Sequence, residues 1–111
     1  MTLNEYQNCA LETAVFRGRG EMAGLMYCGL GLSGEAGEVT DNVKKAWRDD
    51  DGEVTPARKA SMKAELGDVL WYVAVTAAEL GLTLEEIGKS NNDKLRSRKA
   101  RGTLCGSGND R

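Results

Sequence analysis

The chain has 111 residues but contains no histidine, one proline, one phenylalanine and three cysteines. Without histidine, a Cys–His nucleophile is excluded, and so is the di-iron helix-bundle site that needs Glu-x-x-His on two helices. Cys9, Cys28 and Cys105 are odd in number and form no C-x-x-C motif, so we expect reduced thiols in a cytoplasmic protein. No apolar run approaches 18 residues and the N-terminus lacks signal-peptide regions, so we expect neither a membrane span nor secretion.

The chain also lacks a strong net charge. Its formal net charge is −2, so no global basic field would attract nucleic acid, and we expect no nucleic-acid partner. Its length allows one domain with one modest core, so we expect a single domain over residues 1–111. Residues 102–111 carry three glycines and no periodicity, which predicts an extended tail.

Apolar periodicity and helix-end signals predict an all-α fold with a four-helix bundle-like core. Helix starts are marked by two Thr-x-x-Glu capping boxes, at Thr2 and Thr83, and by Thr55-Pro56. Glycines in the predicted turns mark several helix C-termini. The expected helices cover about residues 2–16, 22–47, 56–80 and 84–101.

Two of these helices have unusual composition. The second contains glycines at 29, 31, 34 and 37, each costing up to about 1 kcal/mol relative to alanine, so we allow for a break near residues 29–34. The third is apolar nearly all round from Val69 to Ala78. Such a helix is buried on more than one side, and a chain of this size cannot easily surround it, so we predict an oligomer.

Two acidic doublets are the main candidate site: Glu35-Ala-Gly-Glu38 and Glu65-Leu-Gly-Asp68. Carboxylates three residues apart lie on the same side of a helix, where their repulsion costs a few tenths of a kcal/mol. A divalent cation between them would relieve it. Oxygen ligands without histidine favour Mg²⁺, Mn²⁺ or Ca²⁺, and protein-bound Mg²⁺ usually shares its shell with substrate phosphates. The alternative is that the doublets are ordinary solvated surface.

Other residues are candidates for binding a substrate. Asn91, Lys94, Arg98 and Arg101 share one face of the last helix, which suits either phosphate binding or simple compensation of the helix dipole. Trp47, Trp71 and Tyr72 are candidates for stacking on a base, although aromatic residues at helical spacing more often belong to a core.

Three segments together resemble the MazG-type all-α nucleoside triphosphate pyrophosphohydrolases: Gly31-Leu-Ser-Gly-Glu35-Ala-Gly-Glu38-Val39, Glu65-Leu-Gly-Asp68-Val-Leu-Trp-Tyr72, and Asn91-Asn-Asp-Lys94-Leu95 with Arg98. The resemblance covers roughly residues 22–102, and the tail from Arg101 to Arg111 is similar to the ends of short, single-domain phage and bacterial MazG-like proteins.

The resemblance implies a homodimer or homotetramer that hydrolyses a nucleoside triphosphate between the α and β phosphates. It implies that Glu35, Glu38, Glu65 and Asp68 hold Mg²⁺, which Mn²⁺ can replace. It also implies that Lys94, Arg98 and Asn91 touch phosphates.

One departure from the family pattern bears on the mechanism. Many members place a further Glu directly before the second doublet, where this chain has Ala64. Activation of water must then fall to another carboxylate, and we expect Glu38 to be that catalytic residue. Two alternatives stay open: a sister enzyme such as a phosphoribosyl-ATP pyrophosphohydrolase, and a non-enzymatic helical protein that binds metal or nucleotide.

Overall fold

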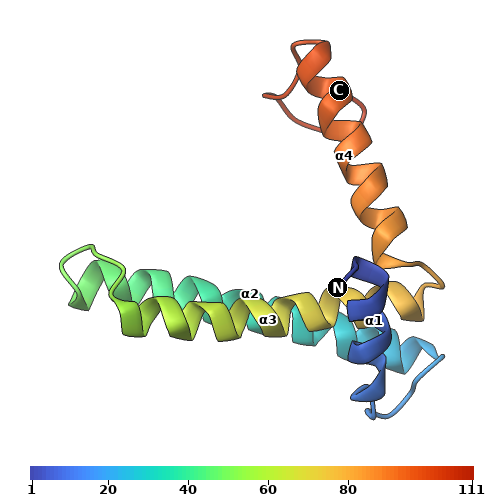
Figure 1. The fold of residues 1–111 in the computed structure, drawn as a ribbon, viewed down its shortest axis with the longest axis horizontal. Coiled ribbons are helices and arrows are strands. Elements are labelled where there is room, and N and C mark those ends of the chain that lie inside the picture. The colour runs from blue at the N-terminus through green and yellow to red at the C-terminus, as the bar shows by residue number, and fades with distance from the viewer.

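The computed structural model describes all residues from 1 to 111 and contains four helices and no strand (Figure 1). They are α1 (Leu3–Glu12), α2 (Met22–Asp49), α3 (Pro56–Glu79) and α4 (Leu84–Ala100). The predicted all-α class is confirmed. Both capping boxes form, and Thr55 accepts a hydrogen bond from the backbone of Arg58 ahead of α3.

The structure corrects two details of the predicted helices. The first helix ends at Glu12 rather than near residue 16, because Thr13 closes it with hydrogen bonds from its backbone and its hydroxyl to the carbonyl of Ala10. The second helix has no break at its glycines and runs for 28 residues. Packing along α3 outweighs the low helix propensity of those glycines.

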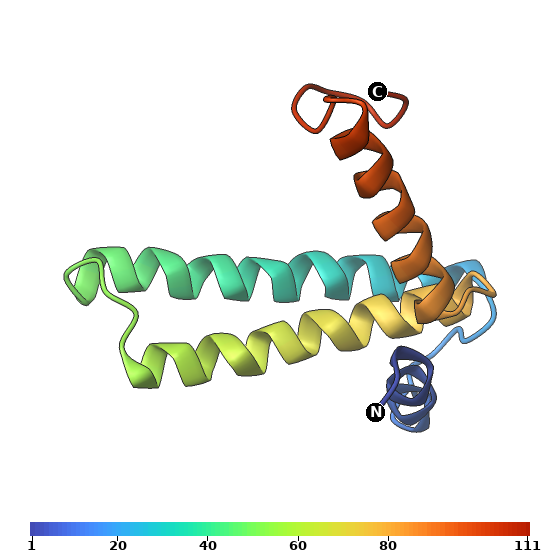
Figure 2. The same cartoon turned by 45° about the horizontal axis from the view of Figure 1, so that its top comes forward.

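The helices α2 and α3 lie side by side and antiparallel, joined at one end by the loop of residues 50–55 (Figures 1 and 2). The short helix α1 lies against α3 near the other end of this hairpin. The last helix, α4, contacts α1 and points away from the hairpin, with a bend of 102° between α3 and α4. The two helices that carry the acidic doublets therefore lie side by side, and α4 stands apart from them.

The buried core is small and lies where α1 crosses the hairpin. Its members are mostly small apolar side chains: Ala10, Ala14, Cys28, Ala74, Val75, Ala77 and Leu84. A buried polar residue, Gln7, connects three elements there. Its side-chain amide donates to the carbonyls of Ala74 and Leu82, each at 3.0 Å, and its carbonyl accepts from the backbone N–H of Leu84 at 3.2 Å. The periodicity of the first helix gave no sign of this role.

A large part of the apolar surface is not covered within one chain. The accessible surface is 7809 Å², against about 6,000 Å² for a compact monomer of this mass. The radius of gyration is 16.8 Å, against about 13 Å for a compact domain of this length. Along the hairpin, the exposed large side chains are Met22, Met26, Tyr27, Leu30, Val43, Trp47, Leu66 and Leu70.

No single helix is long and apolar enough to cross a membrane. Taken together, α3 and α4 have the length and composition of a membrane span, but they are bent relative to each other by 102°.

Candidate metal centre

Three of the four doublet carboxylates meet between α2 and α3. One oxygen from each of Glu35, Glu65 and Asp68 lies within 4.8 Å of the other two. The antiparallel pairing of the two helices brings them together, because Glu65 and Asp68 lie three residues apart on one side of α3 and Glu35 lies opposite them on α2. We call these three residues the acidic trio. Glu35 and Glu65 are half-buried and Asp68 is exposed.

The fourth carboxylate, Glu38, lies one turn beyond Glu35 on α2 and is exposed to solvent. It is not within the trio's 4.8 Å. Its negative charge still reaches Glu35, where it adds to the repulsion described next. The structure therefore separates one carboxylate from the three that converge.

Glu35 is subject to electrostatic repulsion from the neighbouring carboxylates. Desolvation raises the pKa of this carboxyl above its ordinary value, and the negative charges of Asp68 and Glu65 raise it further. A hydrogen bond with Glu65 and the charge of Glu38 act in the same direction. Carboxylates that disfavour each other's ionisation form a local negative site, and a cation placed among them reverses the sign of these interactions.

The donor set and its spacing fit a hard divalent cation. All three donors are carboxylate oxygens, with no nitrogen or sulfur ligand, which is the ligand type that Mg²⁺, Mn²⁺ and Ca²⁺ prefer. Two ligands of one Mg²⁺ lie about 3.0 Å apart when adjacent and about 4.2 Å apart when opposite. Three oxygens that lie within 4.8 Å of one another can share one ion after their side chains draw closer together.

Aromatic rings form a wall beside the trio. A hydrogen bond with Tyr27 and burial raise the pKa of Tyr72 to about 12, and the charges of Tyr27 and Glu35 contribute. The rings of Tyr27 and Phe16 are stacked with centroids 4.6 Å apart, and Trp71 meets Tyr72 edge-on at 4.9 Å. Of the three aromatic candidates from the sequence, Tyr72 and Trp71 thus belong to this wall.

Tyr27 was not predicted as part of the wall, although its spacing could have shown it. It precedes Glu35 by eight residues, which is close to two helical turns and places both on one side of α2. Phe16 lies in the segment expected to be helical and is instead in the loop before α2, so no periodicity could have placed it.

Trp47 lies elsewhere. It is 79% exposed and follows Glu35 by twelve residues on α2, or about 18 Å along the helix axis. Within one chain the structure does not bring Trp47 to the acidic trio.

The candidate phosphate-binding residues of α4 are also distant from the trio within one chain. Asn91 and Lys94 are exposed on α4, which packs on α1 rather than on the middle of the hairpin (Figure 1). Arg98 is only 5% exposed, and its guanidinium donates to the carbonyl of Asn109 at 3.0 Å.

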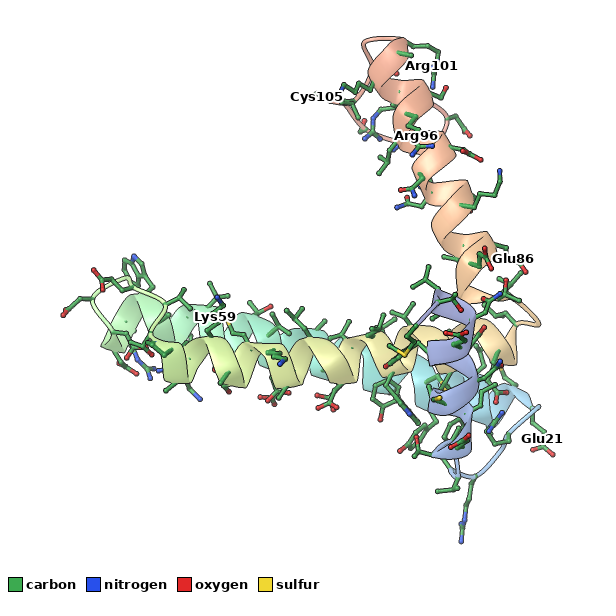
Figure 3. The ribbon with its side chains drawn as sticks, in the orientation of Figure 1. Glu21, Lys59, Glu86, Arg96, Arg101 and Cys105 are labelled. Atoms are coloured by element: carbon green, nitrogen blue, oxygen red, sulfur yellow. The ribbon has the colours of Figure 1, made fainter.

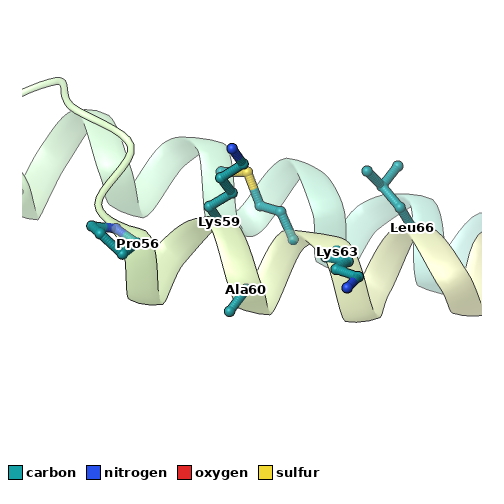
Figure 4. Close-up of a pocket in the computed structure, with 6 residues that line it drawn as sticks. Pro56, Lys59, Ala60, Lys63 and Leu66 are labelled. Atoms are coloured by element: carbon teal, nitrogen blue, oxygen red, sulfur yellow. The ribbon is translucent and has the colours of Figure 1, made fainter.

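An apolar groove runs along the first half of α3 (Figure 4). It has a volume of about 590 Å³ and is lined by Pro56, Lys59, Ala60, Met62, Lys63 and Leu66. None of the trio lines it, so this groove is not the metal centre.

Comparisons with known proteins agree with the geometry. The family model described as the MazG nucleotide pyrophosphohydrolase domain matches residues 27–102, which include both acidic doublets and all of α4. The chain is 45% identical to the "Gene 37 protein" of Mycobacterium phage L5 over 114 aligned positions, and the alignment covers the full length of both proteins. No solved structure matches. On the strength of the matched segment and of the acidic trio within it, the chain belongs to the MazG nucleotide pyrophosphohydrolase family.

Proposed function

We propose that this protein hydrolyses nucleoside or deoxynucleoside triphosphates at the α–β phosphate bond, giving a nucleoside monophosphate and pyrophosphate. The acidic trio carries this proposal, because a family of nucleotide pyrophosphohydrolases supplies the reaction class and the trio supplies a site for the divalent cation. The cation we propose is Mg²⁺, with Mn²⁺ as a substitute.

Four carboxylates would hold the cation: Glu35, Glu65 and Asp68 directly, with Glu38 joining them when substrate is present. A bound Mg²⁺ supplies charge neutralisation and orientation of phosphate oxygens. The half-buried positions of Glu35 and Glu65 keep their oxygens directed between the helices. Hydrolysis of an anhydride depends mostly on positioning and electrostatic stabilisation, so this small set of groups is sufficient.

We assign activation of water to Glu38. It is exposed beside the trio, and in a chain without histidine a carboxylate is the available general base near neutral pH. As the oxygen of water forms its bond to phosphorus, the bridging P–O bond breaks, a proton passes to the carboxylate of Glu38, and pyrophosphate leaves. The absent family glutamate, replaced here by Ala64, leaves this role to Glu38.

The remaining candidates would bind the nucleotide. Tyr72 borders the trio and could contact the base or sugar, and Trp47 could do so from another copy of the chain. Asn91, Lys94 and Arg98 would contact phosphates. Because α4 stands away from the trio, this arrangement requires α4 of a second copy or movement of α4.

Assembly is therefore part of the proposal, and we propose a homodimer or homotetramer in the cytoplasm. One chain exposes about 1,800 Å² more than a compact monomer of its mass. This is about twice the roughly 800 Å² that each partner buries in a standard interface. Light scattering coupled to size-exclusion chromatography should give two or four times the chain mass, and a monomer at micromolar concentration would contradict the assembly.

The test of activity is a screen of canonical and modified nucleotides with Mg²⁺, in which both the monophosphate and pyrophosphate are measured. Glu38→Gln should abolish turnover while the helical circular-dichroism spectrum stays unchanged. Glu53→Gln, which removes an exposed carboxylate from the loop between α2 and α3, is the matched control and should retain full activity. Full activity of Glu38→Gln would refute the assignment of Glu38.

The same screen separates the alternatives. Turnover of phosphoribosyl-ATP alone would point to the sister enzyme. If calorimetry detects binding of neither Mg²⁺ nor a non-hydrolysable triphosphate, the enzymatic proposal is wrong.

A further inference from the structure

Two segments outside the helices fold back on the structure. Residues 102–111, expected as an extended tail, return over the end of α4, where the guanidinium of Arg98 donates to the carbonyl of Asn109 at 3.0 Å. Residues 13–21 join α1 to α2 at the end of the hairpin that α1 crosses, and Figure 3 labels Glu21, the last of them. We call residues 13–21 the strap.

A nearly buried carboxylate holds the strap on α3. The side chain of Glu79, the last residue of α3, is 3% exposed. One of its oxygens accepts from Nε of Arg19 at 2.6 Å, and the other accepts from the backbone N–H of Gly20 at 2.8 Å. The same guanidinium donates to the carbonyl of Ala14 at 2.7 Å. We call Arg19 and Glu79 the clasp, because this pair ties both halves of the strap to α3.

Two further contacts hold the strap against the hairpin. The hydroxyl of Thr13, at its start, accepts from Nε1 of Trp71 at 2.7 Å. In its second half, Gly18 has a φ of 82°, which favours glycine, and lies directly on the first turn of α2. A Cβ added at Gly24 would lie 2.8 Å from the carbonyl carbon of Gly18. The strap therefore packs on both helices of the hairpin.

The clasp touches the aromatic wall. The guanidinium carbon of Arg19 lies 5.6 Å from the ring centre of Phe16. That ring stacks on Tyr27 with 4.6 Å between centroids and 14° between the ring planes. The ring of Tyr27 lies 6.3 Å from that of Tyr72, which borders the acidic trio. A continuous set of contacts thus joins the clasp to the candidate site.

Stability alone does not account for the clasp. The desolvation of two charges offsets most of their attraction, so a buried ion pair usually adds little net stability. Directional hydrogen bonds to both oxygens of Glu79 instead fix where the strap lies, and with it the ring of Phe16. The strap also precedes residue 27, where the matched family segment begins, so the family match gives it no role.

We propose that Arg19 and Glu79 are positioning residues for the nucleotide site, and that they act through Phe16 to hold the aromatic wall where it contacts the bound nucleotide. This inference rests on the proposed function, which gives Tyr72 a contact with the base or sugar. Such a contact is made equally by the substrate and by the transition state. The clasp should therefore affect KM and leave kcat nearly unchanged.

Steady-state kinetics with Mg²⁺ and the nucleotide that the screen identifies tests this role. Arg19→Gln and Glu79→Gln should each raise KM by about fivefold, which corresponds to the loss of one aromatic contact, and keep kcat within about twofold of wild type. Arg17→Gln is the matched control, because Arg17 is an exposed arginine of the strap that takes no part in the bonds holding it. Its KM should not change.

A purely structural clasp gives a different result. Loss of folded protein would lower kcat and leave KM unchanged, and that outcome would overturn the proposal. Arg19→Lys keeps the charge opposite Glu79 but not the hydrogen bond to Ala14. Its KM should therefore lie between those of wild type and Arg19→Gln.

The route through Phe16 is tested by combining variants. Phe16→Leu should raise KM as Arg19→Gln does, and the double variant should show little further increase, since both changes interrupt the same contacts. Val15→Ala is the control, because this neighbouring side chain is 89% exposed. If the two effects on KM multiply, the clasp does not act through Phe16 and the proposal is wrong.

Fluorescence measures the wall without substrate. In a Trp47→Phe background Trp71 is the sole tryptophan, and it contacts both Thr13 and Phe16 of the strap. Both clasp variants should shift its emission to longer wavelength and make it more accessible to acrylamide, whereas Arg17→Gln should not.

The two measurements separate failure of this inference from failure of the proposed function. Unchanged emission in both clasp variants would show that the clasp does not hold the wall, whatever the activity. Absence of turnover with every nucleotide would refute the proposed function and the nucleotide role of the clasp, while a shift in emission would still show that the clasp orders the wall.

Discussion

The close contact between Gly31 on α2 and Tyr72 on α3 yields a quantitative prediction. A Cβ added at Gly31 would lie 2.7 Å from Cδ1 of Tyr72 and still closer to two other ring atoms. Real Cβ atoms essentially never approach within 3.0 Å, so Gly31→Ala must displace the ring or separate the two helices. Alanine should gain about 1 kcal/mol in helix propensity, and overpacking should cost about 1–3 kcal/mol.

The net effect of Gly31→Ala should therefore range from no change to a loss of about 2 kcal/mol in the free energy of unfolding. Gly29→Ala is the matched control, because it lies on the same helix and its Cβ would meet nothing within 4 Å. It should stabilise the protein by up to about 1 kcal/mol. The difference between the two variants isolates the clash, at about 1–3 kcal/mol, or a separation of about 4–12 °C in melting temperature.

Urea unfolding followed by circular dichroism measures both variants under the same conditions. A double-mutant cycle with Tyr72→Leu tests the cause directly, since the smaller side chain should remove most of the cost of Gly31→Ala. If Gly31→Ala stabilises as much as Gly29→Ala, the contact between α2 and α3 is described wrongly. Because Tyr72 lies beside Glu35, Gly31→Ala should also weaken Mg²⁺ binding, whereas Gly29→Ala should not.

Two further predictions concern the trio and the core. Because the pKa of Glu35 is raised, its contribution to the stability of metal-free protein is present below the ordinary value of 4.5 and is lost as pH rises through the folded-state pKa. In urea unfolding with a chelator present, wild-type protein should therefore lose stability relative to Glu35→Gln as pH rises through this range, and a difference that does not change with pH would contradict the repulsion. Gln7→Leu should lower the free energy of unfolding by about 2–4 kcal/mol in the same assay, because the backbone N–H of Leu84 and the carbonyl of Leu82 lose their hydrogen-bond partner. A decrease no larger than that caused by substituting an exposed residue would contradict this role of Gln7.

Local signals in the sequence predicted most of the helical architecture. The capping boxes at Thr2 and Thr83 and the Thr55-Pro56 start lie where the structure has them, because these motifs satisfy backbone donors within four residues. The predicted end of the first helix was wrong, because Thr13 ends the helix through local hydrogen bonds that apolar periodicity does not reveal. The break that the sequence allowed in α2 did not occur, because packing of the whole helix against α3 outweighs the low helix propensity of its glycines.

For the site, too, the sequence predicted the local features and not the tertiary ones. The i, i+3 spacing of each doublet was enough to put both of its carboxylates on one side of a helix, and the lack of histidine was enough to favour oxygen-liganded cations. Which carboxylates converge depends on the register between α2 and α3. That register selects Glu35, Glu65 and Asp68 and leaves Glu38 outside.

The amino-acid sequence thus determined the helices, their starts and the acidic composition of the site, since each depends on interactions between residues a few positions apart. Only the tertiary structure decided the acidic trio, the aromatic wall around Tyr72 and the return of residues 102–111 over the end of α4. These features join residues from different segments, and the packing of whole helices and of the returning segment sets their distances.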